Sequence, residues 1–405
     1  MKTSLQSGAD RIKTADPLAP YYADLHIHIG SALGKAVKIT ASRNLQLQTI
    51  IFEDAPRKGL DIVGIVDAGS TLVISELRKM LAEGDLTEIP QGGCLARNGI
   101  LVVLASEIES REGVHLVSYL PDLYSLEAWQ TYFRNRVRNQ QLSTQRAAAG
   151  VQEIIDLTTT LGGIFCPAHV FTPHKGIYGA WTDRLTNKLE APKQQFKALE
   201  LGLSADTEMA GRLAETAEYV FLSNSDAHSS ANIGREFNLL QLGGLNFMEL
   251  RQCIESLDGR RILANYGLHP RLGKYHRSFC PECSTITTDD PPVTQCALCG
   301  YERVVMGVYD RIVAIQDYAQ AQAPPNRPPY HYRVPLKDLP GIGGKTCHRL
   351  LQVFKNELEL LEQAPLEEIR REAGAKAADA IGKMRSGDLF IIPGGGGRYG
   401  RVRLG

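Results

Sequence analysis

The stretch YADLHIHI at residues 22–29 places two histidines, His26 and His28, two positions apart in an apolar run. Successive side chains of a β-strand point to opposite faces, so residues two positions apart share a face. The stretch therefore predicts a strand that presents both imidazole rings on one side. Imidazole rings grouped in this way are typical ligands of zinc and related divalent ions.

Further apolar runs follow this one along the chain. They are rich in valine, isoleucine and leucine, and helical stretches separate several of them. We predict them as strands over 61–67, 100–107, 114–120, 163–169, 198–203 and 220–226. This alternation predicts an α/β domain with a largely parallel sheet, either open or closed into a barrel.

Histidines and acids stand at the ends of these predicted strands. The set comprises His26, His28, Asp67, Glu107, His115, His169, Asp226 and His228. Because chemistry in α/β barrels collects at the carboxyl ends of the strands, we predict that these side chains form one metal centre. They are too many for one ion, so we expect two or three divalent ions, with Zn²⁺ first and Mn²⁺ or Mg²⁺ as alternatives. Each residue taken alone could instead be a satisfied polar group near a strand end.

Together these residues resemble the motifs of the PHP (polymerase and histidinol phosphatase) superfamily. The resemblance implies a distorted seven-stranded β/α barrel with a metal-dependent phosphoesterase site, which we assign to residues 1–268. The chain departs from the superfamily at Ala68, where a histidine is usual. We expect Glu107 to bridge two ions; the remaining ligands would divide into His26, His28 and Asp226 for one ion, His115 and His169 for another, and Asp67 and His228 for a third.

Other motifs are similar to those of the endonuclease Q family, which nicks DNA on the 5′ side of deaminated bases. They are FTP at 171–173 with YG at 178–179, GLSAD at 202–206, SNSDAH at 223–228, IGRE at 233–236 and GKYH at 273–276. The resemblance implies a DNA repair endonuclease whose partner is DNA with uracil, hypoxanthine, xanthine or an abasic site. Metal-activated hydroxide would attack the phosphorus and leave 3′-hydroxyl and 5′-phosphate ends, with Glu107 and Asp226 as the catalytic residues.

Two C-x-x-C pairs follow the predicted barrel. They comprise Cys280, Cys283, Cys296 and Cys299, with twelve residues between the pairs. Four thiolates at this spacing close a tetrahedral structural zinc site, whereas a redox dithiol needs only one pair. We predict a small zinc module over 269–320 that depends on its ion for folding. The other four cysteines lie scattered in apolar contexts and are expected to be core thiols.

A third domain is predicted over 321–405, beginning with a proline-rich connector and ending in a flexible glycine-rich tail or a tight loop. Its helical part contains the turn LPGIGGKT at 339–346, which resembles a helix-hairpin-helix. Glycines at 341, 343 and 344 would let a DNA phosphate approach the backbone beside Lys345, at the N-terminus of the following helix. A plain helix–helix connector is the alternative reading of this turn.

The sequence also suggests where a damaged base would bind. An enzyme acting beside such a base can read it by flipping it out of the stack. Asn224 and Ser204 offer hydrogen-bonding groups near the predicted metal ligands, and Phe171 and Tyr178 could stack on the base. The alternative is that Asn224 and Ser204 only orient metal ligands.

The composition is that of an ordinary globular protein. The 405 residues are 43% hydrophobic and 22% charged, which fits two or three domains. The 45 basic and 45 acidic side chains exclude a strongly basic polymer binder but not an enzyme with a local basic surface.

The chain also lacks the signals of membrane proteins and secreted proteins. No run approaches the ~18 apolar residues of a membrane span. Residues 1–20 contain Asp10 and Asp16 and no apolar core, so we expect no signal peptide. We therefore predict a cytoplasmic protein with reduced cysteines and no membrane partner.

Two other functions remain as alternatives at this point. One is a PHP-type phosphatase of small molecules, such as histidinol phosphatase, which would need only the barrel. The other is a DNA-binding scaffold without catalysis, which would show gaps in the ligand set, and Ala68 is one such gap. The sequence names no clamp protein or other protein partner.

Overall fold

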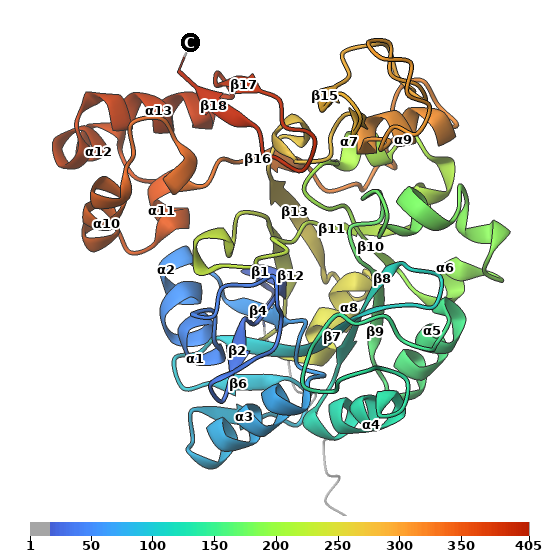
Figure 1. The fold of residues 1–405 in the computed structure, drawn as a ribbon. Helices are drawn as coiled ribbons and strands as arrows, with labels where there is room; N and C mark the ends of the chain where they lie inside the picture. The colour runs from blue at the N-terminus through green and yellow to red at the C-terminus, as the bar shows by residue number, and fades with distance from the viewer. Residues whose placement is uncertain (1–16, 405) are drawn as a thin grey trace, which may run out of the picture.

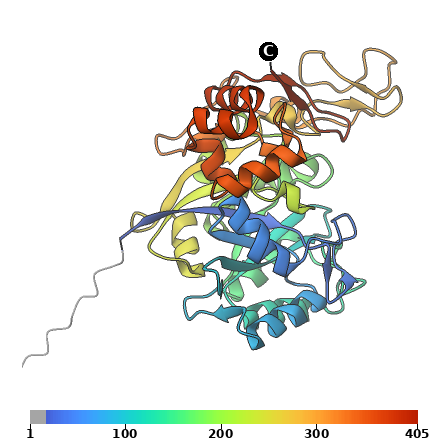
Figure 2. The ribbon, with the colours of Figure 1, turned by 90° about the vertical axis from the view of Figure 1, so that its left-hand side faces the viewer.

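The computed structural model describes residues 17–404, and the N-terminal segment through residue 16 lies outside them. A barrel of strands and helices forms one end of the molecule (Figure 1). The cysteine module and the C-terminal helices both lie at the other end, as Figure 2 shows from the side. Within residues 17–404, no helix is both long enough and apolar enough to span a bilayer.

Each of the seven stretches predicted as strands overlaps an observed strand. These are β1 (Ala19–Ile27), β4 (Ile62–Ile65), β7 (Leu101–Glu109), β8 (His115–Leu120), β9 (Ile164–Pro167), β10 (Ala198–Glu200) and β11 (Val220–Leu222). Two strands that the sequence analysis missed, β12 (Phe237–Leu242) and β13 (Arg261–Gly267), extend the sheet beyond β1. Strands β10 and β11 pair with each other, and after β11 an isolated parallel bridge between Ile27 and Ala227 brings the chain back beside β1.

The sheet is mixed rather than largely parallel, which corrects the expectation from the sequence. The pairs β1–β4, β4–β7 and β10–β11 are parallel, whereas β7–β8, β8–β9, β1–β12 and β12–β13 are antiparallel. Parallel neighbours need a crossover of a dozen residues or more. Only residues 110–114 join β7 to β8, so these two strands can pair only in the antiparallel direction.

Helices and short elements surround the barrel strands. The helices are α1 (Leu47–Thr49), α2 (Ala55–Lys58), α3 (Thr71–Ala82), α4 (Leu123–Phe133), α5 (Val151–Thr160), α6 (Pro192–Gln195), α7 (Thr207–Ala210) and α8 (Phe247–Ile254). The short strands are β2 (Ser31–Ala32), β3 (Lys35–Ala36), β5 (Leu86–Glu88) and β6 (Cys94–Ala96).

Strand β7 shows why the barrel strands read as continuous apolar runs. Leu101, Val103 and Ala105 belong to one buried cluster with residues of α8. Val102 and Leu104 belong to a second cluster with residues of α3 and α4. Both faces of the strand are therefore buried, which is typical of strands covered by helices on each side.

The cysteine module consists of a hairpin and one helix. Strands β14 (Phe279–Cys280) and β15 (Thr285–Ile286) pair antiparallel. Helix α9 (Val308–Ile315) packs back onto the barrel, because Val308, Ile312 and Ile315 belong to the same apolar cluster as the barrel strands.

The C-terminal part forms its own apolar cluster. The elements of this C-terminal part are β16 (Tyr330–Tyr332), α10 (Gly344–Val353), α11 (Glu357–Glu362), α12 (Leu366–Ala373), α13 (Ala375–Ser386), β17 (Phe390–Ile392) and β18 (Arg401–Arg403). Leu268 and Leu272 from the end of the barrel region join this cluster. A buried ion pair, Lys58 Nζ to Glu357 Oε2 at 2.7 Å, also ties α11 to α2 of the barrel.

Candidate metal centre

The first group of candidate ligands contains His26, His28 and Asp226, which offer ligand atoms within 4.8 Å of one another. Both histidines turn Nε2 toward Asp226 Oδ1, at 3.7 Å from His26 and 3.2 Å from His28. His26 lies in the buried part of β1, His28 follows the strand, and Asp226 follows β11. The shared face predicted from the spacing of the two histidines is present.

The second group contains Glu107, His115 and His169. Glu107 Oε1 lies 3.0 Å from His115 Nδ1 and 3.5 Å from His169 Nε2. The same oxygen lies 3.6 Å from His26 Nε2 of the first group. The Glu107 carboxylate therefore stands between the two groups, where a ligand shared by two ions would have to be.

Several of these ligand atoms are buried without a hydrogen-bond partner. They are His26 Nε2, Glu107 Oε1 and His115 Nδ1. A buried polar atom without a partner is costly, so native structures rarely leave one unexplained. Imidazole nitrogens and carboxylate oxygens converging on one point suit Zn²⁺ or Mn²⁺. The residues present therefore fit divalent ions, which would satisfy these atoms.

The carboxylates of the centre favour protonated imidazoles when no ion is bound. Burial lowers the pKa of His26, but Glu200, Glu107 and Asp226 outweigh it and raise that pKa to about 10. Burial raises the pKa of Glu107, but His115 and Lys38 hold it well below its usual range. Ions must displace the imidazole protons, so the affinity of the centre for metal should rise with pH.

A carboxylate that the sequence analysis missed supports three residues of the centre. Glu200 Oε2 lies 2.9 Å from His26 Nδ1 and accepts a hydrogen bond from Asn224 Nδ2, also at 2.9 Å. Its other oxygen accepts from the backbone N–H of His169 at 3.1 Å. Carboxylates bonded to the second nitrogen of a ligand histidine fix the orientation of its ring. An acid inside the apolar run of β10 was the available signal, since a buried charge requires partners.

Asp67 lies on the far side of His28 from the other ligands. Its two oxygens are 3.0 and 3.1 Å from His28 Nδ1, whereas His28 Nε2 faces Glu107 and Asp226. Asp67 Oδ2 also accepts the backbone N–H of Ile29 at 2.6 Å. This placement suits a residue that orients His28, and it does not support Asp67 as a ligand of a third ion.

His228 belongs to neither group of three, but it lies beside the first, with Nδ1 3.6 Å from Asp226 Oδ1. Its Nδ1 lies 3.0 Å from the carbonyl oxygen of Asp226, and its ring centre is 4.4 Å from that of His28. Burial and the neighbouring His28 lower the pKa of His228 to about 4. Its ring lines the pocket above the centre.

Two candidate ligands have a backbone conformation that residues other than glycine rarely adopt. His169 has φ +30° and Asp226 has φ +45°. Such residues cost free energy and persist where the surrounding structure holds them. Close to His169 the chain requires glycine, since a Cβ on Gly202 (φ +78°) would lie 2.7 Å from the His169 Cβ.

Six of the candidate ligands, all except His26 and Asp67, line a pocket of about 510 Å³. Lys38, Lys175 and Lys274 contribute three cations to its walls. Lys38 Nζ is 3.4 Å from Glu107 Oε2, and Thr144 Oγ1 donates a hydrogen bond to the same oxygen at 2.8 Å. The pocket thus combines a negative floor, suited to metal ions, with cationic walls suited to phosphate.

The structure corrects most of the predicted base-binding residues. Phe171 and Tyr178 are buried in the core and stack on each other at 5.3 Å, so neither is available to a base. Asn224 is fully buried, and its amide oxygen accepts from the Leu25 N–H and from Asn238. Asn224 therefore supports the centre, as its alternative reading held, and only Ser204 lines the pocket.

The four cysteines of the module converge as the spacing predicts. The sulfur atoms of Cys280 and Cys299 lie 3.6 Å apart, as do those of Cys283 and Cys296. A hydrogen bond with Thr285, aided by the other three thiols, lowers the pKa of Cys283 to about 7. These four sulfurs form a group that could hold one metal ion, and four thiolates are a ligand set of structural zinc sites.

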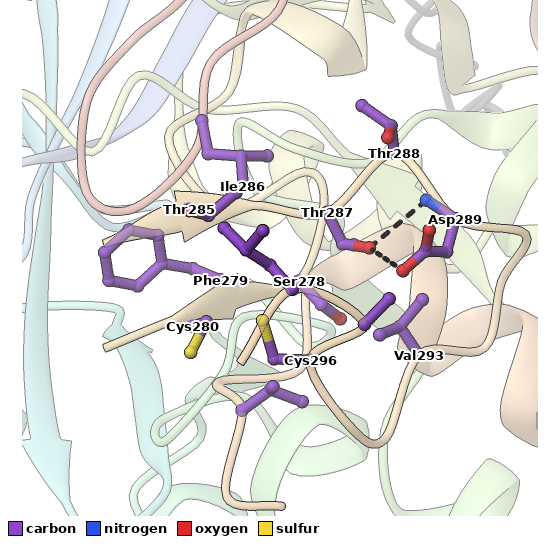
Figure 3. A pocket seen from close by; sticks show the side chains of 13 residues that line it. Ser278, Phe279, Cys280, Thr285, Ile286, Thr287, Thr288, Asp289, Val293 and Cys296 are labelled. Atoms are coloured by element: carbon purple, nitrogen blue, oxygen red, sulfur yellow. Dashed lines mark hydrogen bonds between the residues drawn. The ribbon is translucent and has the colours of Figure 1, made fainter. Parts of the chain in front are cut away.

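A separate pocket of about 290 Å³ lies beside the cysteines, as Figure 3 shows. Apolar side chains such as Phe279, Ile286 and Val293 line it, and a hydrogen bond from Thr287 Oγ1 to Asp289 closes one side. Its lining contains no histidine or lysine, so the pocket lined by the candidate ligands is the better candidate for the active site.

The predicted hairpin turn lies at the surface of the C-terminal part. Gly341 has φ +88°, Gly343 caps the N-terminus of α10, and nothing lies within 4 Å of a Cβ placed on Gly343 or Gly344. Lys345 is exposed in the first turn of α10, which contains no acid. The turn therefore leaves room for a phosphate beside free backbone N–H groups.

Glu236 is a buried acid close to the centre, and it yields a test of stability against pH. It accepts hydrogen bonds from Ser223 Oγ and from the Leu268 N–H, yet burial raises its pKa from 4.5 to about 8. The folded protein then binds a proton that the unfolded chain releases between these values, so this group reduces stability as pH rises from 4.5 to 8. Glu236→Gln should remove that loss and gain roughly 1–3 kcal/mol over the wild type between pH 5 and pH 8.

Urea denaturation of both proteins at several pH values measures this difference. Contributions from the metal ligands cancel in the comparison because both proteins contain them. If the free energies of unfolding of the two proteins changed with pH in the same way, the loss of stability could not be assigned to Glu236.

Comparison with known proteins extends the similarity over nearly the whole chain. No family model matches the sequence. The uncharacterized protein YqxK of Bacillus subtilis is 38% identical over 391 residues, which cover 94% of this chain and 99% of that protein. The lesion-specific endonuclease PfuEndoQ from Pyrococcus furiosus has a similar structure, with a TM-score of 0.81, 31% identity and coverage of 95% of this chain and 96% of that one.

A second solved structure is similar to the same degree. It is endonuclease Q in complex with a 27-mer duplex substrate that has an abasic lesion at the active site. The TM-score is 0.81 at 30% identity, and the match covers 96% of this chain and 97% of that chain. The chain therefore belongs to the endonuclease Q family, and its enzyme class is that of a hydrolase of phosphodiester bonds.

Proposed function

We propose that this enzyme nicks DNA on the 5′ side of deaminated bases and abasic sites and leaves 3′-hydroxyl and 5′-phosphate ends. The observation that carries the proposal is the meeting of the two ligand groups at Glu107, on the floor of a pocket with lysines in its walls. The similar structure that contains an abasic-lesion duplex supports DNA as the substrate. Family membership also argues against the alternatives of a small-molecule phosphatase and a non-catalytic scaffold.

The ions bound in this centre would supply an activated water as nucleophile and neutralise charge on the phosphate. Glu107 fixes the spacing of the two groups, because one of its oxygens faces His26, His115 and His169. Lys38 places an ammonium group beside the other oxygen and can pair with a phosphate oxygen of the substrate. Lys175 and Lys274 would bind the flanking phosphates at the wall of the pocket.

The damaged base would occupy one side of the pocket, beside the candidate ligand His169. Residues 172–175, 202–204 and 274–275 form its walls there. Tyr275 is partly exposed, and its N–H donates to Ser204 Oγ at 3.3 Å. Uracil, hypoxanthine and xanthine each present a carbonyl beside a ring N–H, so backbone groups of the 202–204 loop could pair with them. An abasic site would bind through its phosphates alone.

A nicking assay tests this function directly. Duplex oligonucleotides with one internal uracil, hypoxanthine or abasic site are incubated with Zn²⁺, Mn²⁺ or Mg²⁺ beside an undamaged duplex. We expect one nick on the 5′ side of each lesion, and DNA ligase should seal it because the ends are 3′-hydroxyl and 5′-phosphate. Absence of nicking with every ion would refute the proposal, as would rapid hydrolysis of nitrophenyl phosphate with the DNA left intact.

The hairpin turn should contribute to binding of all DNA, damaged or not. Lys345→Glu and Gly343→Val are expected to weaken both, because phosphate contacts carry no sequence information. The slope of log affinity against log salt should fall by about one for Lys345→Glu. Fluorescence anisotropy of labelled duplexes measures both effects.

Lys79→Glu is the matched control for this charge reversal. Lys79 is exposed on α3, at the end of the molecule away from α10 (Figure 1). It should leave the affinity unchanged. A loss at Lys345→Glu that is confined to damaged DNA would mean that the turn reads the lesion.

A further inference from the structure

The sequence predicted either a flexible tail or a tight loop for the glycine-rich C-terminal segment. The structure shows a loop. Strands β17 and β18 pair antiparallel, and residues 393–400 form the loop between them. Three backbone N–H groups of this loop, from Gly394, Gly397 and Gly400, donate to carbonyls of residues 271, 274 and 272 at 2.7, 3.1 and 2.9 Å. The loop is thereby fastened to the segment that supplies Lys274 to the wall of the pocket.

One aromatic side chain of this loop lies near two cations. The Tyr399 ring centre is 5.1 Å from the guanidinium of Arg235 and 5.7 Å from the ammonium of Lys274. Cations at this distance from an aromatic face are attracted by its quadrupole, by ~0.5–2 kcal/mol. Tyr399 therefore contacts a cation that lines the pocket and a second cation, Arg235, that is 7% exposed.

Arg235 in turn bonds the backbone on both sides of a candidate metal ligand. Its Nε donates to the carbonyl of Ser225 at 2.8 Å, and Nη2 donates to the carbonyl of Asp226 at 3.4 Å. Asp226 has φ +45°, in the left-handed region that non-glycine residues adopt only when held there. The two bonds from Arg235 fix the carbonyls that flank this strained residue.

We propose that Tyr399 is a positioning residue for the metal centre. Its ring holds Arg235 against the carbonyls of Ser225 and Asp226, which aims the Asp226 carboxylate at His26 and His28. The C-terminal loop thus completes the centre from outside the barrel. The inference rests on the proposed role of Asp226 as a ligand, and it adds a part of the chain that makes no contact with the ligand atoms themselves.

Ion affinity tests this role independently of nicking. Tyr399→Ala, Tyr399→Phe and Tyr124→Ala are stripped of barrel ions and titrated with Zn²⁺ against a chelating dye. Tyr124 is 81% exposed on α4 and serves as the matched control. Loss of residues that support ligands typically weakens ion binding 10- to 100-fold, so we expect at least a tenfold loss for Tyr399→Ala. Tyr399→Phe keeps the ring and should stay within about twofold of the wild type, as should Tyr124→Ala.

Kinetics on the abasic-site duplex provide the second measurement. Tyr399→Ala should lower kcat at limiting metal and leave KM within about twofold, because the ring does not touch DNA in this proposal. A rise in KM with unchanged ion affinity would overturn the proposal and assign the loop to DNA binding. Equal losses for Tyr399→Phe and Tyr399→Ala would also overturn it, since the phenol hydroxyl rather than the ring would then be responsible.

Arg235→Lys provides a second route should Tyr399→Ala fail to fold. Lysine keeps the charge but cannot bond both carbonyls, so ion affinity should fall as it does for Tyr399→Ala. The double variant Arg235→Lys with Tyr399→Ala should lose no more than Arg235→Lys alone, because the ring acts through Arg235. Additive losses would contradict this order of action. If the wild type binds ions but nicks no DNA, the proposed function fails while these affinities still decide the role of Tyr399.

Discussion

Glu107→Ala is expected to lower the rate of nicking at an abasic site by roughly 10²–10³-fold or more. The carboxylate faces both sets of candidate ligands, with Oε1 within 3.6 Å of His26, His115 and His169. Without this carboxylate, nothing would set the spacing of two ions. The imidazoles of His26, His115 and His169 would also lose the acid that they face. Single-turnover nicking with saturating enzyme measures the chemical step apart from DNA binding.

Two further variants separate this role from damage to the fold. Glu107→Gln keeps the shape but removes the charge and should lose almost as much activity. Glu83→Ala removes an exposed acid at the end of α3 and should nick at the rate of the wild type. Affinity for DNA and the melting temperature should change little in either Glu107 variant. A rate above a few per cent of the wild type for Glu107→Ala would exclude a shared ligand at this position.

Cys283→Ser is expected to remove one equivalent of zinc and to destabilise the C-terminal half of the molecule by at least about 3 kcal/mol. Structural zinc supplies folding free energy, and this small module has little apolar core of its own. The loss should spread, because Gly396 of the C-terminal loop lies against Phe279 of β14, next to Cys280. Zinc content and thermal unfolding measure the two effects together.

Cys347→Ser is the matched control among the cysteines. Cys347 lies half-buried on α10, outside the group of four sulfurs. It should keep all its zinc and melt close to the wild type. A normal melting curve together with a full zinc content for Cys283→Ser would refute a structural site at these four cysteines.

The strands and the shared face of the first two histidines could be predicted because local pattern determines them. Buried strands read as apolar runs, and residues two apart on a strand share a face, which brought His26 and His28 together. The missed strands β12 and β13 carry the buried amides of Asn238 and Asn265. Asn265 Nδ2 donates to Asn238 Oδ1 at 2.9 Å, a contact between strands that no local pattern shows.

The direction of the strands and the partners of buried polar groups are decided by tertiary contacts. The sequence shows that only a short segment follows β7, and its length alone would have predicted an antiparallel neighbour for β7. The partners of Asn224 could not be predicted from the sequence. Its amide bonds Glu200, which is 24 residues away in sequence, and the N–H of Leu25, which is 199 residues away. Likewise, nothing local distinguishes Phe171 and Tyr178 as core side chains from aromatic groups at a pocket.

The packing of α9 has a consequence for the way this protein can be divided into fragments. A fragment cut at residue 268, where the sequence predicts that the barrel ends, would lose Val308, Ile312 and Ile315 from the apolar cluster they share with the barrel. The surface that they cover would face water, and exposed apolar patches of that kind drive self-association. The shortest fragment that keeps this surface covered therefore extends past residue 315 and carries the cysteine module with it.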